Sequence, residues 1–114
     1  MFKLDKQQRD GVLVLALEGS LDAMTAATFK PEVVAIADSK ALQIVCDLSP
    51  LTLIDSTGVG VLISLFKRTR AQGGHVYFAG LSAQPKEVFR LLRLDKSLDL
   101  FPTVAEAVSK ITTA

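Results

Sequence analysis

The chain has 114 residues, 49% of them hydrophobic, and a formal net charge of +1. A chain of this size and composition can bury one core without disulfides or structural metals, so we expect a single domain over residues 1–114. The near-neutral charge argues against a nucleic acid as partner, because the only cluster of cations is KRTR at 67–70. That cluster is typical of a helix C-terminus, where the macrodipole favours cations.

The sequence has no apolar segment typical of a membrane-spanning or secreted protein. Its longest apolar run, GVGVLISLF, is far below the roughly 18 residues that span a bilayer, and MFKLDKQQRDG lacks a signal-peptide core. We therefore expect a cytoplasmic protein without membrane insertion. Cys46 is the only cysteine and alternates with apolar residues in LQIVCDL, which predicts a buried thiol rather than a redox group.

Apolar periodicity predicts alternating strands and helices after an opening hairpin. The two strands of that hairpin flank RDG, a turn signal, and the second of them is apolar enough to be covered on both faces. The expected elements, in chain order, are strands 2–7 and 12–19, a helix within 20–40, strand 41–48, helix 57–71, strand 75–80, helix 82–94, a short edge strand in 97–101, and a helix after Thr103.

Two details complete this expected fold. Pro31 must either kink the first helix or restrict the main helix to a start near Lys30, because an interior proline removes a hydrogen bond and clashes with the preceding turn. SPLTLID at 49–55 is interpreted as a connection. The strand and helix order then favours right-handed parallel crossovers. We expect an α/β domain with a mixed sheet of four to five strands, opening with an antiparallel hairpin, and about four helices.

The stretch LIDSTGVGVLISLFK, residues 53–67, places hydroxyls and glycines between a strand and an apolar helix. A Walker-type phosphate loop would need a lysine directly before the Ser or Thr, and here no lysine occurs before Lys67. The three-glycine spacing of a dinucleotide site is missing as well. The sequence therefore predicts no nucleotide cofactor at this junction.

A serine nucleophile at Ser56 is also disfavoured. The nucleophile elbow has glycines two residues on either side of its serine, whereas Ile54 precedes Ser56 at that spacing. The only histidine, His75, opens a strand after GG and is predicted to be an exposed turn residue rather than a general base. We expect no catalytic residue here.

Three carboxylates, on Asp22, Asp47 and Asp55, lie near the C-terminal ends of strands, where sites form in α/β folds. They could meet at one edge of the sheet and hold a metal or support hydrolysis. Neither an aromatic lining nor a second base accompanies them in the sequence. The sequence therefore predicts no metal site.

The simplest role for this junction is a helix start. Either Asp55 or Ser56 would be a good N-cap. Gly58 and Gly60, however, each destabilise a helix by about 1 kcal/mol relative to alanine. We infer that something needs the backbone there to be closely approached or uncovered.

The helix also predicts an exposed apolar pair. By the 3.6-residue period, Val59, Leu62 and Phe66 face the sheet, whereas Val61 and Leu65 project to roughly the opposite side. An exposed pair beside a small-residue helix start is either a chance feature or a docking surface.

These segments resemble the STAS domain, specifically the bacterial anti-sigma factor antagonists (anti-anti-sigma factors). VCDLSPLTLIDSTGVGVLISLFKRTRAQGG is similar to the family pattern of an apolar strand, D-L-S, then D-S-[ST]-G-x-G and an apolar helix ending in G-G. LEGSLDAMTAATF upstream and VFRLLRLDKSLDLFPTVAEAV downstream extend the similarity to nearly the whole chain. A STAS fold is the implied architecture, although Pro31 departs from the usual uninterrupted first helix.

The resemblance implies a phosphorylation-switched binding protein rather than an enzyme. Its phosphoacceptor would be Ser56, with Thr57 as the rival, and its partner an anti-sigma factor that is also a serine kinase of the histidine-kinase-like ATPase fold. A PP2C-type phosphatase would reverse the modification, so partner switching would regulate transcription. The expected partner-binding residues are Asp22, Asp55, Thr57, Gly58, Gly60, Val61 and Leu65.

Two other readings remain open at this point. The same family includes STAS subunits of phospholipid-transport ABC systems, which dock on an ATPase. A third reading is a hydrolase built on Asp22, Asp47 or Asp55.

Overall fold

The protein is built on one six-stranded sheet. The computed structural model describes residues 1–113. Its elements in chain order are β1 (Phe2–Arg9), β2 (Val12–Leu21), α1 (Ala23–Asp38), β3 (Gln43–Asp47), β4 (Leu51–Ile54), α2 (Ser56–Ala71), β5 (His75–Ala79), α3 (Ala83–Leu91), α4 (Leu94–Ser97), β6 (Asp99–Phe101) and α5 (Val104–Thr113).

The sheet is mixed, as the sequence predicts. Its order is β1-β2-β3-β5-β6, and β4 pairs with β2 beyond the end of β3. Only β1 and β2 are antiparallel. The turn between them is formed by Asp10 and Gly11, with φ angles of 54° and 80°, and two positive φ angles are what a two-residue hairpin turn of type I′ requires.

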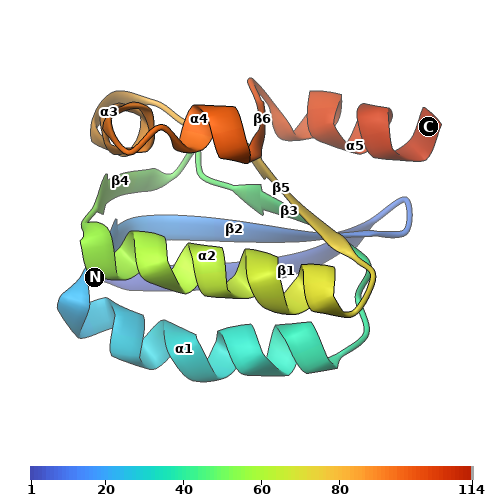
Figure 1. The fold of residues 1–114 in the computed structure, drawn as a ribbon, viewed down its shortest axis with the longest axis horizontal. Coiled ribbons are helices and arrows are strands. Elements are labelled where there is room, and N and C mark those ends of the chain that lie inside the picture. The colour runs from blue at the N-terminus through green and yellow to red at the C-terminus, as the bar shows by residue number, and fades with distance from the viewer. Residues whose placement is uncertain (114) are drawn as a thin grey trace.

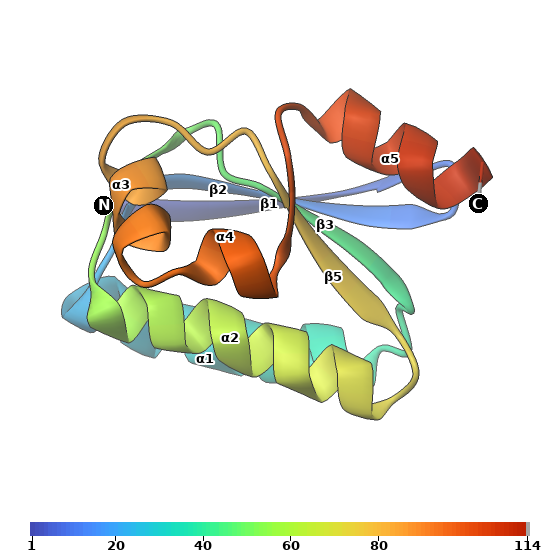
Figure 2. The ribbon, with the colours of Figure 1, turned by 45° about the horizontal axis from the view of Figure 1, so that its top comes forward.

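Helices cover the sheet unequally. α1 and α2 lie side by side on one face, and α5 lies on the other (Figure 1, Figure 2). Alternate residues of the central strands divide between the two cores: Ile44 and Cys46 face α1 and α2, while Val45 packs with α5. The larger core is therefore the one beneath α1 and α2.

Two elements were not predicted. Residues 49–55 are not a plain connection, because Leu51–Ile54 forms β4 parallel to β2. This strand is only four residues long, too short for a period to stand out. On its other side the amide of Gln84 in α3 donates to the Ile54 carbonyl and accepts from the Ile54 N–H, both at 2.9 Å. A side chain thus satisfies the edge that another strand would occupy. The second unpredicted element is α4.

Pro31 neither delays nor divides the first helix, which runs unbroken over Ala23–Asp38. Because proline has no N–H, the carbonyl of Ala27 lacks its helical donor. Both Ala27 and Pro31 are exposed, so water can hydrate that carbonyl. The buried side of the helix, with Phe29 and Val33, is unaffected.

Cys46 is fully buried in the core, as predicted, and desolvation together with the neighbouring Asp47 raises the pKa of its thiol to about 12. A thiol this hard to ionise is not reactive. Among residues 1–113, no helix combines the length and apolarity needed to cross a bilayer.

Candidate functional site

The N-termini of α1 and α2 meet at one end of the sheet. β2 and β4 run parallel, with Leu21 opposite Ile54, so the residues that follow them, Asp22 and Asp55, come out side by side. Each strand leads directly into a helix, and both helices start at the same end of the molecule (Figure 1). The site therefore lies where two helix dipoles present their positive ends.

Asp55 holds the two helix starts together. Of the two residues expected as cap, it is Asp55 that serves as N-cap of α2, its Oδ1 accepting from the Gly58 N–H at 2.9 Å. Its Oδ2 accepts from the Ala23 N–H of α1 at 3.1 Å. One carboxylate thus accepts hydrogen bonds from backbone N–H groups of both helices, which fixes the position of one helix relative to the other.

Asp22 caps α1 by a reciprocal arrangement. Its Oδ1 accepts from the N–H groups of Met24 and Thr25, both at 3.0 Å, and the Thr25 hydroxyl accepts from the Asp22 N–H at 2.9 Å. The bond from the Thr25 N–H is the main cause that lowers the pKa of the Asp22 carboxyl from its ordinary value of 3.8. Asp22 is therefore kept ionised at the site.

Replacing Asp22 by Asn is expected to reduce the loss of stability that the protein undergoes as the pH is lowered. Asn also caps helices, so the fold should survive. Since the folded-state pKa is lowered below the ordinary value of 3.8, the stability that the carboxylate contributes is present above that ordinary value and is lost as pH falls through the folded value. Urea unfolding at pH 6 and pH 3 should show a larger acid loss for the wild type than for Asp22→Asn. A difference between the two proteins that stays constant with pH would contradict this role.

Ser56 and Thr57 form the exposed first turn of α2. The first helical hydrogen bond of α2 runs from the Val59 N–H to the Asp55 carbonyl, at 2.9 Å. The amides of Ser56 and Thr57 precede that bond and have no acceptor inside the helix. A hydroxyl at position 56 is thus accessible, beside backbone donors that suit an anion.

The two glycines of this turn have different roles. Gly58 is buried, and a Cβ there would lie 2.4 Å from the Leu21 carbonyl oxygen, so this glycine permits close packing of α2 on β2 rather than approach of a partner. Our expectation that a partner uses Gly58 is therefore wrong. Gly60 is exposed, and a Cβ there would meet nothing within 4 Å. Only Gly60 leaves open space at the surface.

The prediction of an exposed apolar pair is also wrong. Val61 is 3% exposed and Leu65 is fully buried. The physical reason is that α2 has two apolar neighbours, the sheet on which it packs and α1 beside it on the same face (Figure 1). The side of α2 that we expected to face solvent is therefore covered by α1.

The exposed apolar side chains at this end are different ones. Met24 is 85% exposed in the first turn of α1, and Leu53 is 45% exposed on β4, two residues before Asp55. We did not predict either. The signal for Met24 was present, since placing the cap at Asp22 and the buried stripe at Ala26 and Phe29 leaves Met24 on the outer side.

The three carboxylates do not converge. Asp22 and Asp55 are neighbours, but Asp47 ends β3 and accepts from the N–H and hydroxyl of Ser49, at 3.0 and 2.7 Å. Within residues 1–113, no group of three His, Cys, Asp or Glu side chains is arranged to hold a metal ion. Asp22, Asp47 and Asp55 therefore do not form the single site that a hydrolase or a metal ion would need.

His75 cannot serve Ser56, because it follows the opposite end of α2, a helix of 16 residues and thus about 24 Å long. Its Nδ1 lies 2.8 Å from the Arg70 guanidinium, which can only donate, so Nδ1 accepts and Nε2 donates to Asp99. His75 is thus partly buried and bridges α2 to β6, rather than being an exposed turn residue.

Comparison with known proteins agrees with this architecture. The chain is 27% identical to the anti-sigma-B factor antagonist of Bacillus subtilis over 97 residues, 85% of this chain and 88% of that protein. It is 31% identical to the anti-sigma-B factor antagonist of Listeria monocytogenes over 84 residues, 72% of each. The crystal structure of an anti-sigma factor antagonist from Mycobacterium paratuberculosis superposes with a TM-score of 0.89 at 22% identity, over 98% and 95% of the chains, and so shares the fold. The family model described as the STAS domain matches residues 3–107, and the chain therefore belongs to the STAS domain family.

Proposed function

We propose that this chain is an anti-sigma factor antagonist whose binding to its partner is switched off by phosphorylation of Ser56. The observation that carries the proposal is the exposed hydroxyl of Ser56 at the joined starts of α1 and α2. The names of the Bacillus and Listeria relatives support the class of partner, an anti-sigma factor. The role is that of a binding protein rather than an enzyme, acting in the bacterial cytoplasm.

The geometry explains why a phosphate could be tolerated by the domain. Phosphorylation adds a charge of about −1.5 to −2. The free amides of Ser56 and Thr57 and the dipole of α2 favour an anion at this point. Asp55, which holds both helices, uses its oxygens on Gly58 and Ala23 and need not move. The modified domain should keep its fold.

A docked partner, in contrast, would cover that charge. The exposed side chains at this end of the sheet include the apolar Met24 and Leu53, and a partner that covers them together with Ser56 would exclude water from the phosphate. Burying an ionised group without a counter-charge is costly, and each ~1.4 kcal/mol lost lowers affinity tenfold. Phosphorylation would therefore release the partner without refolding of either protein.

In the proposed circuit the anti-sigma factor is itself the serine kinase, with the histidine-kinase-like ATPase fold, and a PP2C-type phosphatase restores the hydroxyl. Asp22, Asp55, Thr57 and Gly60 would lie within the contact surface. Gly58 and Leu65 are too deeply buried to touch a partner.

The proposal is tested by capture and phosphate mapping. Immobilised unmodified protein is incubated with an extract of the source organism, and the bound protein is expected to be an anti-sigma factor with an ATPase-type kinase domain. Incubation of the purified pair with ATP should then place phosphate on Ser56, and Ser56→Ala should remove it while Thr57→Ala retains it. Phosphate mapped to Thr57 would exchange the two roles. Failure to retain any anti-sigma factor would refute the proposed function.

A further inference from the structure

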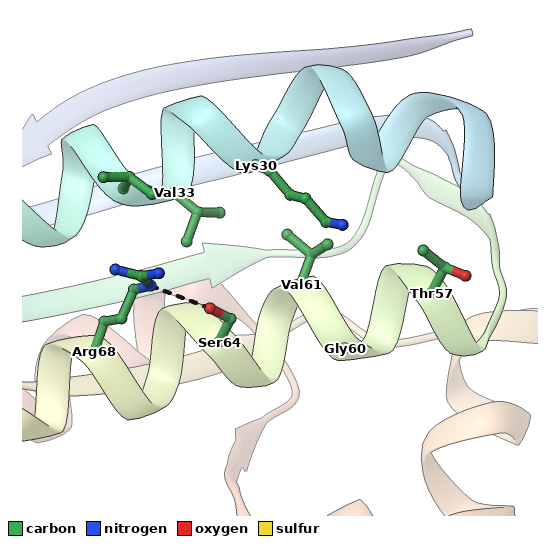
Figure 3. Close-up of a pocket in the computed structure, with 8 residues that line it drawn as sticks. Lys30, Val33, Thr57, Gly60, Val61, Ser64 and Arg68 are labelled. Carbon is green, nitrogen blue, oxygen red and sulfur yellow. Dashed lines mark hydrogen bonds between the residues drawn. The ribbon is translucent and has the colours of Figure 1, made fainter.

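A groove of about 460 Å³ runs between α1 and α2 on the outer face of the molecule (Figure 3). It begins at Thr57, next to the proposed phosphoacceptor, and reaches Arg68. Eleven residues separate these two positions, which is about 16 Å along the helix axis. The groove is therefore about as long as three turns of a helix lying along it, and its volume suits a few side chains of such a helix.

The floor of the groove is apolar and hollow. Val33 of α1 and Val61 of α2 form its base, and Gly60 leaves a gap that the rest of the chain does not fill. A glycine inside a helix destabilises it by about 1 kcal/mol relative to alanine. At Gly58 close packing accounts for that loss, but at Gly60 no neighbour within 4 Å does. The open space at Gly60 fits a side chain from outside the domain.

The walls of the groove are cationic. Lys30 extends from α1 and Arg68 from α2 into the space between the helices (Figure 3). The Arg68 Nε donates to the Ser64 hydroxyl at 3.3 Å, which steadies the guanidinium while leaving its terminal nitrogens free of that bond. None of the residues that line the groove is acidic, and within residues 1–113 neither cation forms an ion pair.

From this charge and shape we infer that the groove receives an acidic amphipathic helix of the partner. Its apolar side chains would fill the gap at Gly60 and pack on the exposed Val34, and its carboxylates would pair with Lys30 and Arg68. Recognition of an amphipathic helix by a groove uses this combination of apolar anchors and flanking charges. A basic helix would face uncompensated repulsion from both walls, so the charge selects one class of partner.

This inference rests on the proposed function and adds a reason for the switch. Thr57 lines the groove, and Ser56 precedes it. An acidic segment lying in the groove would come close to a phosphate on Ser56, so like charges would repel across the interface. Repulsion from the phosphate would then oppose the attraction between the partner and the cations of the groove.

The groove is tested first without any natural partner. Two capped 14-residue helical peptides share a leucine stripe, and one has glutamates where the other has lysines. Titrated into ¹⁵N-labelled protein, the glutamate peptide is expected to shift the amide signals of Gly60, Val61 and Val34 in a saturable way, and the lysine peptide is not. Equal responses to both peptides, or no response at these amides, would overturn the inference.

Charge reversal provides the matched comparison. Lys30→Glu/Arg68→Glu should weaken binding of the glutamate peptide at least tenfold. Lys67→Glu/Lys110→Glu makes the same change in net charge at exposed positions that do not line the groove, and should weaken it less than threefold. An equal loss in both double variants would indicate attraction to the whole molecule and would overturn the inference.

The anti-sigma factor identified by capture separates the inference from the proposed function. Its affinity should fall at least tenfold for Lys30→Glu/Arg68→Glu and stay within threefold for the control pair. If the groove variant binds normally while Ser56→Asp does not, the groove inference fails and the proposed function stands. If the wild type binds no anti-sigma factor, the proposed function fails, and the peptide titration still decides the chemistry of the groove.

Discussion

The substitution Gly58→Ala is expected to destabilise the protein by about 2 kcal/mol or more, whereas Gly60→Ala should stabilise it by about 1 kcal/mol. Alanine has the same intrinsic advantage over glycine in a helix at both positions. At Gly58, however, the new methyl group would lie 2.4 Å from the Leu21 carbonyl oxygen and 2.9 Å from the Ile54 side chain. Overpacking of this kind typically destabilises by 1–3 kcal/mol, and occasionally by more.

The clash at Gly58 is hard to relieve, because its nearest neighbour is backbone. The Leu21 carbonyl accepts from the Asp55 N–H at 3.2 Å, so moving it disturbs the hydrogen bond that brings the end of β2 to the start of α2. At Gly60 there is open space within 4 Å and no left-handed backbone, so the methyl group meets neither obstacle.

Urea unfolding of the three proteins measures the effect, with the slope of free energy against urea used to check that each unfolds in two states. The two variants differ from the wild type by the same atoms, so they control for each other. A stabilised Gly58→Ala, or a Gly60→Ala as damaged as Gly58→Ala, would contradict the packing described for this helix start.

Local signals in the sequence were sufficient to predict the helix start at which the proposed site lies. Either Asp55 or Ser56 was expected to cap the apolar helix, and the structure places Asp55 there. The parallel order of the strands was predicted too, which brings the ends of neighbouring strands together. The register that makes Asp55 bind Ala23 depends on β4, which is too short to leave a periodic pattern.

The orientation of α2 was not predictable from its own period. A helix that packs on a sheet alone has one apolar side, but a helix that also has another helix beside it has two. Val61 and Leu65 occupy the second of these sides, against α1. The information lies in the packing of two helices that are separated by 17 residues of sequence, so a pattern read within one helix assigns these residues to solvent. The groove of Lys30 and Arg68 was missed for the same reason, since each wall comes from a different helix.

The largest effect on binding is expected from charge at position 56. Ser56→Asp should weaken binding of the anti-sigma factor by about 2 kcal/mol, roughly 30-fold, while Ser56→Ala should bind within threefold of the unmodified wild type and stay bound in the presence of ATP. Aspartate has one negative charge where phosphoserine has nearly two, so the phosphorylated protein should bind more weakly still.

This comparison should not be affected by unfolding of the variant, and a neutral variant controls for the size of the side chain. Ser56 is exposed at the first position of α2, where the favourable interaction of an aspartate with the helix dipole, about 0.3–1 kcal/mol, opposes its repulsion from Asp22 and Asp55, so Ser56→Asp should keep the fold. Ser56→Asn has nearly the same shape as Ser56→Asp without the charge. Its affinity therefore separates steric exclusion from electrostatic repulsion.

Calorimetric titration of the four proteins with the captured anti-sigma factor, at low and high ionic strength, provides the measurement. Repulsion predicts that Ser56→Asn binds much like the wild type and that added salt narrows the difference between Ser56→Asp and Ser56→Asn, because exposed parts of the interaction are screened. A Ser56→Asn protein as weak as Ser56→Asp would mean that the partner fits too closely around a small hydroxyl to accept any larger side chain. The switch would then act by volume, and the charge of the phosphate would be incidental to it.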